Sequence, residues 1–134
     1  MSRQTAQAMQ NWYYGKNKDL QMNLIGVTHV GEIAVIEPMV KRLDASAAPA
    51  FRLAVLDLIA AGDSRLVFDL TGVDFIDSSG LGSMVSILKA LSGRGGIAIC
   101  NASAAVLSLF RLTRMDKVFS IVPGRDEAVA KVTA

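Results

Sequence analysis

The stretch "LVFDLTGVDFIDSSGLGSMVSILKAL", residues 66–91, decides the fold that we expect for this chain. Together with the preceding Arg65, its first part forms a short apolar run, residues 65–70, that follows a helical segment, which is typical of a buried strand. A turn and a second apolar patch come next, and from Ser79 to Leu91 the apolar residues recur at helical spacing. The stretch therefore predicts a strand, a turn and a helix, with one acid, two hydroxyls and two glycines at the start of the helix.

Strands and helices alternate on both sides of this unit. Residues 20–26 and 32–39 predict an N-terminal antiparallel hairpin with its turn at "THVG", residues 28–31. Further helices are predicted at 43–63, 103–113 and 124–134, and further strands at 97–100 and 117–122. Strict alternation with short connections predicts parallel strands joined by right-handed crossovers. We expect one α/β domain over residues 20–134, with residues 1–19 as an N-terminal extension that shows neither periodicity.

The ends of two predicted helices carry the residue types that cap helices. Asp44 or Ser46 is expected to cap the helix of residues 43–63, and Gly62 to end it. At the next helix, the simpler interpretation of Ser78 is an N-cap, with the nearby glycines permitting tight packing. The functional interpretation is that a phosphate on Ser78 would meet free backbone donors and the positive end of the helix dipole. Residue chemistry alone favours the simpler one.

Composition limits the classes of function. The chain has 134 residues, of which 51% are hydrophobic and 19% charged, as in a globular domain with a single core. A net charge of +2 is too small to indicate binding to nucleic acid or to an anionic membrane. Between Ser78 and Met115 there is no acid, and the cations there are Lys89, Arg94, Arg111 and Arg114. This asymmetry favours either a solvated basic face, which is the simpler interpretation, or an acidic partner.

No membrane-spanning or export segment is predicted. The richest apolar stretch is interrupted by Arg52 and Asp57, and the first 19 residues lack the apolar core of a signal peptide. The single cysteine, Cys100, cannot form an intrachain disulfide and is expected to be a small buried hydrophobe. We therefore expect a cytoplasmic protein without membrane insertion.

An enzyme is disfavoured. The only histidine, His29, falls in the predicted hairpin turn, far in sequence from any serine nucleophile. Ser86-x-x-Lys89 lacks the companion motifs of serine-lysine enzymes, and the chain has no phosphate-binding or dinucleotide-binding glycine motif and no clustered His/Cys ligand set. Asp69 closes a strand, where a carboxylate commonly accepts hydrogen bonds from loop N–H groups, so a structural role is favoured over a metal-binding or acid–base role. No cofactor, metal or catalytic residue is expected.

The stretch 66–91 resembles the signature region of STAS domains, specifically of bacterial anti-sigma factor antagonists. In that pattern an apolar strand ends in Asp-Leu, and Asp-Ser-Ser/Thr-Gly-Leu-Gly opens a helix. The matching residues here are Asp69, Leu70, Asp77, Ser78, Ser79, Gly80, Leu81 and Gly82. The resemblance continues in "RLDASAAPAFR" (42–52) and "LFRLTRMDKVFSIV" (109–122). It implies a single STAS domain, a mixed, mostly parallel sheet with about four helices packed mainly on one face.

The resemblance also implies a phosphorylation switch at Ser78, with Ser79 as the second candidate. The unmodified protein would bind an anti-sigma factor that is also a serine kinase, phosphorylation would break the complex, and a PP2C-type phosphatase would restore it. The expected partner-binding residues are Asp44, Asp77, Ser78, Ser79, Gly80, Leu81, Gly82, Ser83 and Ser86, with the face of Ser83, Ser86 and Lys89 free for contact. The alternatives left open are a non-catalytic STAS subunit of an ABC-type lipid transporter and a stressosome-like scaffold. The sequence does not indicate an oligomeric state.

Overall fold

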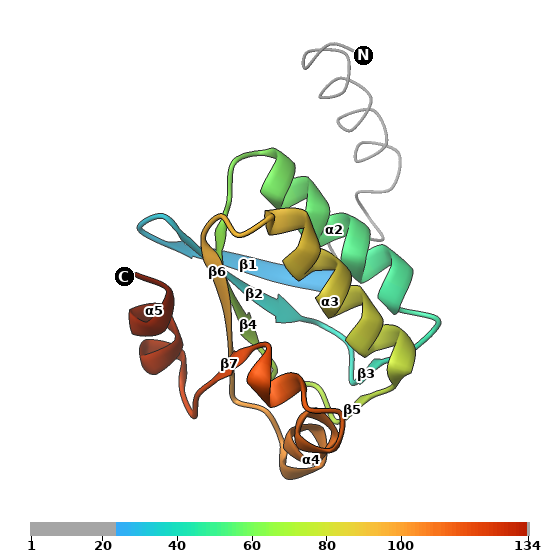
Figure 1. Cartoon of the computed structure of the whole chain (residues 1–134). Helices are drawn as coiled ribbons and strands as arrows, with labels where there is room; N and C mark the ends of the chain where they lie inside the picture. Colours follow the sequence, from blue (N-terminus) through green and yellow to red (C-terminus); the bar gives the residue numbers. More distant parts are fainter. Residues whose placement is uncertain (1–23, 134) are drawn as a thin grey trace.

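A five-stranded sheet forms the centre of the molecule. In the computed structural model, which describes residues 24–133, the strands lie in the order β1-β2-β4-β6-β7 (Figure 1). The strand bounds are Ile25–Val30 for β1, Ile33–Pro38 for β2, Arg65–Asp69 for β4, Gly96–Cys100 for β6 and Ser120–Ile121 for β7. The β1–β2 pair is antiparallel, whereas β2, β4, β6 and β7 run parallel to one another. The predicted α/β class with a mostly parallel sheet is confirmed.

Three helices cover one face of the sheet and one helix covers the other (Figure 1). The first group is α2 (Ala48–Ala60), α3 (Ser78–Leu91) and α4 (Ala104–Leu112), and the single helix is α5 (Arg125–Thr133). Successive strand residues point to opposite faces, so Phe68 of β4 lies in the larger core with Phe51 and Phe110, whereas Val67 lies in the smaller core with Ala128 of α5. None of the helices within residues 24–133 has the length and apolar character that crossing a bilayer requires.

The N-terminal hairpin lies further along the chain than the sequence predicted. Thr28, His29 and Val30 belong to β1 and not to a turn, and the turn consists of Gly31 and Glu32, closed by the pair Val30–Ile33. Gly31 has φ +59°, and a two-residue hairpin turn needs such a left-handed residue, which glycine supplies without steric cost. The part of the predicted first strand before residue 24 lies outside the described residues.

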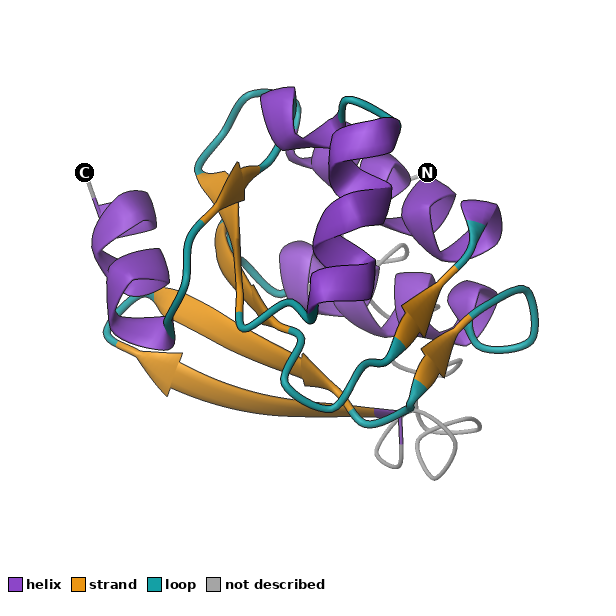
Figure 2. Ribbon diagram, turned by 90° about the horizontal axis from the view of Figure 1, so that it is seen from below, coloured by secondary structure: helices purple, strands orange, loops and turns teal. Residues whose placement is uncertain are grey.

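Two short parallel strands form a second sheet, which the sequence did not predict as a pair. β3 (Arg42–Leu43) pairs with β5 (Phe75–Ile76), and Figure 2 shows both beside the helices and apart from the main sheet. The first turn of α3 packs directly on β3, because a Cβ atom added to Gly80 would overlap the carbonyl oxygen of Leu43. The expectation that glycine permits close packing is therefore confirmed at Gly80. It is wrong at Gly82, where an added Cβ atom would meet nothing within 4 Å.

Two other helix and strand ends differ from the prediction. α2 begins after Ala47, which makes no side-chain capping bond, and the carboxylate of Asp44 is instead bonded to Ser46. Neither predicted residue caps the helix, because the chain between them forms its own local turn. The strand predicted at 117–122 is only two residues long, β7 (Ser120–Ile121). Lys117 belongs instead to a 3₁₀ helix, η1 (Met115–Lys117).

The two glycines at the start of α3 provide a matched pair of substitutions. We expect Gly80→Ala to destabilise the fold by about 2 to 3 kcal/mol, because the added methyl group overlaps a backbone oxygen that cannot rotate away. Gly82→Ala has open space and replaces a helical glycine, so it should raise stability by up to about 1 kcal/mol. Urea unfolding of both variants measures this difference, and equal effects would contradict the proposed packing of α3 on β3.

Candidate functional site

The start of α3 presents two exposed serines after a capping aspartate. Asp77 is the N-cap, with an extended backbone, and its Oδ1 accepts a hydrogen bond from the N–H of Gly80 at 3.0 Å. Ser78 is the first helical residue, so the interpretation of Ser78 as N-cap is wrong; the extended backbone at Asp77 makes that residue the N-cap. Because capping is done by Asp77, the exposed hydroxyl groups of Ser78 and Ser79 are available for other chemistry.

Asp44 lies next to this helix start. In the parallel pair β3–β5, Leu43 is opposite Ile76, so the next residues, Asp44 and Asp77, leave the two strands at the same end. A hydrogen bond of 2.7 Å from the Ser46 hydroxyl lowers the pKa of the Asp44 carboxyl below its ordinary value, against the opposing effect of desolvation. Asp77 directly precedes the predicted switch serine, Asp44 follows the neighbouring strand β3, and the Asp44 carboxyl is ionised at neutral pH.

An arginine and a phenylalanine on the small sheet also belong to this surface, although the sequence analysis did not find them. The guanidinium carbon of Arg42 lies 4.1 Å from the ring centre of Phe75, and its Nε lies 3.6 Å from Asp44. Both side chains are exposed. Cation–π pairs form at this distance, and Arg and aromatic residues are frequent at protein interfaces. Their proximity depends on the β3–β5 pairing, which no local sequence pattern indicates.

Two shallow grooves run along the two sides of α3, and each contains one of the serines. The α3–η1 groove contains Ser78 and is lined by Ser78, Leu81, Gly82, Val85, Ser86, Lys89 and Met115. The α2–α3 groove contains Ser79 and is lined by Ala45, Ala48, Pro49, Arg52, Ser79, Gly82, Ser83 and Ser86. Consecutive helical residues are separated by about 100° around the axis, so adjacent hydroxyls face different grooves.

The other predicted partner-binding residues divide into surface and interior positions. Gly80 is buried, so its predicted surface role is corrected to an interior one. Ser83 is also largely buried, and its hydroxyl donates to the carbonyl of Gly80 at 2.6 Å, although Ser83 still lines the α2–α3 groove. Gly82 is exposed and Leu81 is half-buried. Ser86 is also half-buried, and its hydroxyl accepts a 2.7 Å hydrogen bond from Nε of Arg52, a residue of α2 that the sequence analysis did not assign to the site.

The histidine lies away from the serines. His29 is in β1, its Nε2 is 3.1 Å from Asp63, and it pairs with Ala34 near the start of β2. Ser78 lies after β5, and the chain reaches β5 from the carboxyl end of β4, which is the opposite end of the parallel strands. Within residues 24–133 no three His, Cys, Asp or Glu side chains gather closely enough to hold a metal ion.

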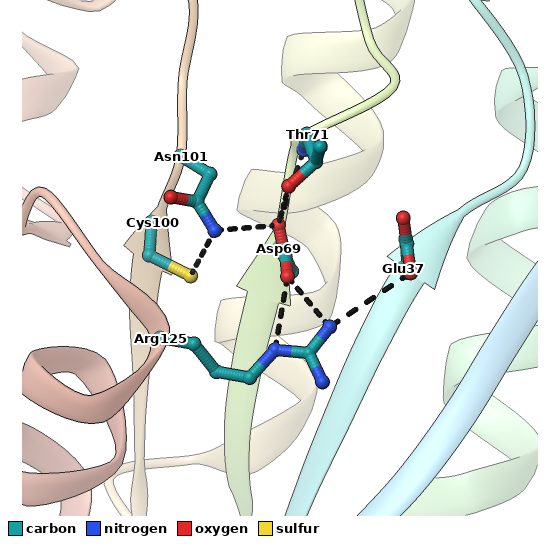
Figure 3. Close-up of polar contacts among 6 residues, drawn as sticks. All are labelled: Glu37, Asp69, Thr71, Cys100, Asn101 and Arg125. Carbon is teal, nitrogen blue, oxygen red and sulfur yellow. Dashed lines mark hydrogen bonds and ion pairs between the residues drawn. The ribbon is translucent and has the colours of Figure 1, made fainter.

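A second polar cluster surrounds Asp69 at the carboxyl end of β4 (Figure 3). Its Oδ1 accepts hydrogen bonds from the N–H and hydroxyl of Thr71 and from Nδ2 of Asn101, and its Oδ2 accepts two from Arg125, at 3.0 and 2.6 Å. Glu37 of β2 lies 3.8 Å from the same guanidinium. The expectation that Asp69 accepts loop N–H bonds is confirmed at Thr71, and the cluster fastens α5 to the sheet.

Ionisation within this cluster follows from the same contacts. Burial alone would raise the pKa of Asp69, but the hydrogen bonds from Thr71, Asn101 and Arg125 outweigh it, and the pKa lies below its ordinary value. Burial, with the nearby charge of Asp69, raises the pKa of the Cys100 thiol to about 11. The thiol is therefore protonated at neutral pH, and Cys100 is the buried hydrophobe that the sequence predicted.

Comparison with known proteins adds to this geometry. The family described as STAS domain matches residues 16–128. A candidate anti-sigma factor antagonist from Thermotoga maritima is 30% identical over 105 residues, which are 77% of this chain and 92% of that protein. The crystal structure of a candidate antagonist from the same organism has a TM-score of 0.77 at 25% identity, over 85% of this chain and 98% of that one. Phosphorylated SpoIIAA of Bacillus, with a TM-score of 0.62 at 22% identity over 81% of this chain and 98% of that one, shares the fold alone.

The Asp77 cap can be tested by truncation. We expect Asp77→Ala to lower the free energy of unfolding by about 1 kcal/mol, since the N–H of Gly80 loses its acceptor. Asp74→Ala, at an exposed position three residues earlier, is the control and should change it by less than about 0.5 kcal/mol. Thermal or urea unfolding measures both, and an unaffected Asp77→Ala variant would contradict the assignment of the cap.

The Asp69 cluster predicts a pH-dependent contribution to stability. A carboxyl group whose folded pKa is lowered stabilises the fold fully above its unfolded pKa, about 4, and loses that contribution as the pH falls through the folded pKa. Asp69→Asn should therefore cost about 2 to 3 kcal/mol at pH 7, and less as the pH is lowered below about 4. Urea unfolding between pH 7 and pH 3 tests this, with Asp126→Asn at an exposed position of α5 as the control. A cost that stays constant over this range would contradict it.

Proposed function

The chain belongs to the STAS domain family, and we propose that it acts as an anti-sigma factor antagonist switched off by phosphorylation of Ser78. The observation that carries the proposal is the exposed hydroxyl of Ser78 in the first turn of α3, beside a cap formed by another residue. The antagonist name of a relative that is 30% identical supports the same role. The protein acts by binding, and neither catalysis nor a cofactor is part of the proposed function.

The surroundings of Ser78 explain how one phosphate would break a complex. A phosphoserine carries a charge of about −1.5 to −2, and it would lie directly after Asp77, at the end of the small sheet where Asp44 also lies. A partner docked on this face would have to bury that charge or to meet it with enough positive charge. Repulsion and desolvation then weaken binding without refolding the domain. The expected partner is an anti-sigma factor that is also a serine kinase, and a PP2C-type phosphatase would reverse the modification in the cytoplasm.

Mass spectrometry tests the switch directly. We expect the intact protein from its native host to carry one phosphate-sized mass increment that maps to Ser78 and is lost in Ser78→Ala. Ser79→Ala is the matched control, because it removes the neighbouring exposed hydroxyl, and it should retain the increment. A phosphate that maps to Ser79 would move the switch to the second candidate.

The alternative roles have different outcomes in the same experiment. A protein that stays unmodified across growth and stress conditions would contradict the phosphorylation switch and favour a constitutive STAS subunit of an ABC-type lipid transporter. Co-purification with a kinase-type anti-sigma factor supports the antagonist. Co-purification with a permease and its ATPase, or with a large assembly of STAS proteins, supports the transporter subunit or the stressosome-like scaffold respectively.

A further inference from the structure

We propose that the α3–η1 groove binds an acidic amphipathic helix of the partner protein. This inference deepens the proposed function by assigning the chemistry of the partner. Only the regulation of the groove by phosphorylation of Ser78 rests on the proposed function. The groove begins at Ser78 and continues beside α3 to Lys89, twelve helical residues that span about 16 Å at 1.5 Å of rise per step. A partner helix of about three turns would fill it.

The floor of the groove is apolar. Leu81 and Val85 lie one turn apart on α3, and Met115 of η1 faces them from the other side. All three are half-buried and pack against the main core, so their positions are fixed before any partner binds. Gly82 keeps the space above this floor open, because nothing lies within 4 Å of an added Cβ atom. The apolar side of a helix is the partner surface that fits such a floor.

The one charged side chain that lines the groove is positive. Lys89, the one charged residue among those that line it, is exposed at its far end. Arg52 of α2 lines the neighbouring α2–α3 groove, and its Nε donates to Ser86, which lines both grooves. Neither α3 nor α4 contains an acidic residue. Asp116 follows Met115 in sequence, but it lines a different hollow together with Arg111. An acidic partner segment therefore gains from charge complementarity here.

Charge also argues against the N-terminal segment of this chain as the occupant. Residues 1–23 contain three cations, Arg3, Lys16 and Lys18, and one acid, Asp19, so the segment carries a formal charge of +2. A segment of that charge would meet a like charge at Lys89. An acidic helix would be attracted there, and a phosphate on Ser78 would add about two negative charges at the other end of the groove, next to Asp77. The same charge would then oppose the partner helix.

Two synthetic helices test the groove without knowledge of the partner. The first is an amphipathic peptide of about four turns with leucines on one side and glutamates beside them, and the second has lysines in place of the glutamates. Binding to the full chain is followed by the backbone amide signals in NMR. We expect the acidic peptide to bind, with the largest shifts at Leu81, Gly82 and Val85, and the basic peptide to bind at least about fivefold more weakly.

Charge variants of the full chain provide the controls. Lys89→Glu should weaken binding of the acidic peptide about fivefold, whereas Lys131→Glu, on α5 across the sheet, should leave it unchanged. Ser78→Glu should weaken binding of the acidic peptide as well, whatever mass mapping shows about phosphorylation in the host. A groove that does not bind the peptide and a Ser78 that is not phosphorylated are therefore separate results.

The proposal has clear contrary outcomes. Equal binding of the two peptides, no binding, or shifts confined to α5 would overturn it. Groove signals that move on Trp12→Ala in the absence of peptide would identify residues 1–23 as the occupant, and signals that move with protein concentration would identify a second copy of the chain. Either result would also overturn it.

Discussion

The approach of Gly80 to the carbonyl oxygen of Leu43 is the contact on which the candidate site depends. It brings the first turn of α3 against β3, and β3 is in turn paired with β5, which leads into α3. Asp44, which follows β3, and Asp77 and Ser78, which follow β5, lie at the same end of the small sheet as a result. Any side chain larger than hydrogen at residue 80 would push the helix from the strand and separate these groups. One glycine therefore fixes the geometry of a surface to which it contributes no atoms of its own.

Three aspartates illustrate how environment assigns different roles to one residue type. Asp69 is buried and serves the fold, because its hydrogen bonds hold β4, the loop after β6 and α5 together. Asp77 is half-buried and serves the helix as its cap. Asp44 accepts local bonds from Ser46 and keeps its charge near the surface. The first role secures the scaffold, and the other two determine the shape and charge around the serines.

The periodicity of apolar residues and the alternation of strands and helices predicted most of the fold, because each strand of the main sheet and each helix packed on it buries an apolar face. The local patterns were insufficient where the structure depends on a distant contact. The β3–β5 pair joins residues 33 positions apart through two pairs, and so Arg42 and Phe75 remained unrecognised. Capping failed for a similar reason, since Asp77, Ser78 and Ser79 are all competent caps by type and only the backbone entering the helix selects Asp77. At the site, the motif did not indicate burial, which separates Gly80, packed on Leu43, from the exposed Ser78 and Ser79.

The position of the two serines on different sides of α3 has an evolutionary consequence. Ser78 faces one groove and Ser79 the other, and each groove has residues that the other lacks, such as Met115 in the first and Pro49 in the second. Substitutions at residues that line only one groove alter that groove and leave the other intact. After gene duplication, two copies of such a domain can therefore diverge in the proteins that they recognise while both retain the helix start, and paralogues within one cell need not interfere with one another.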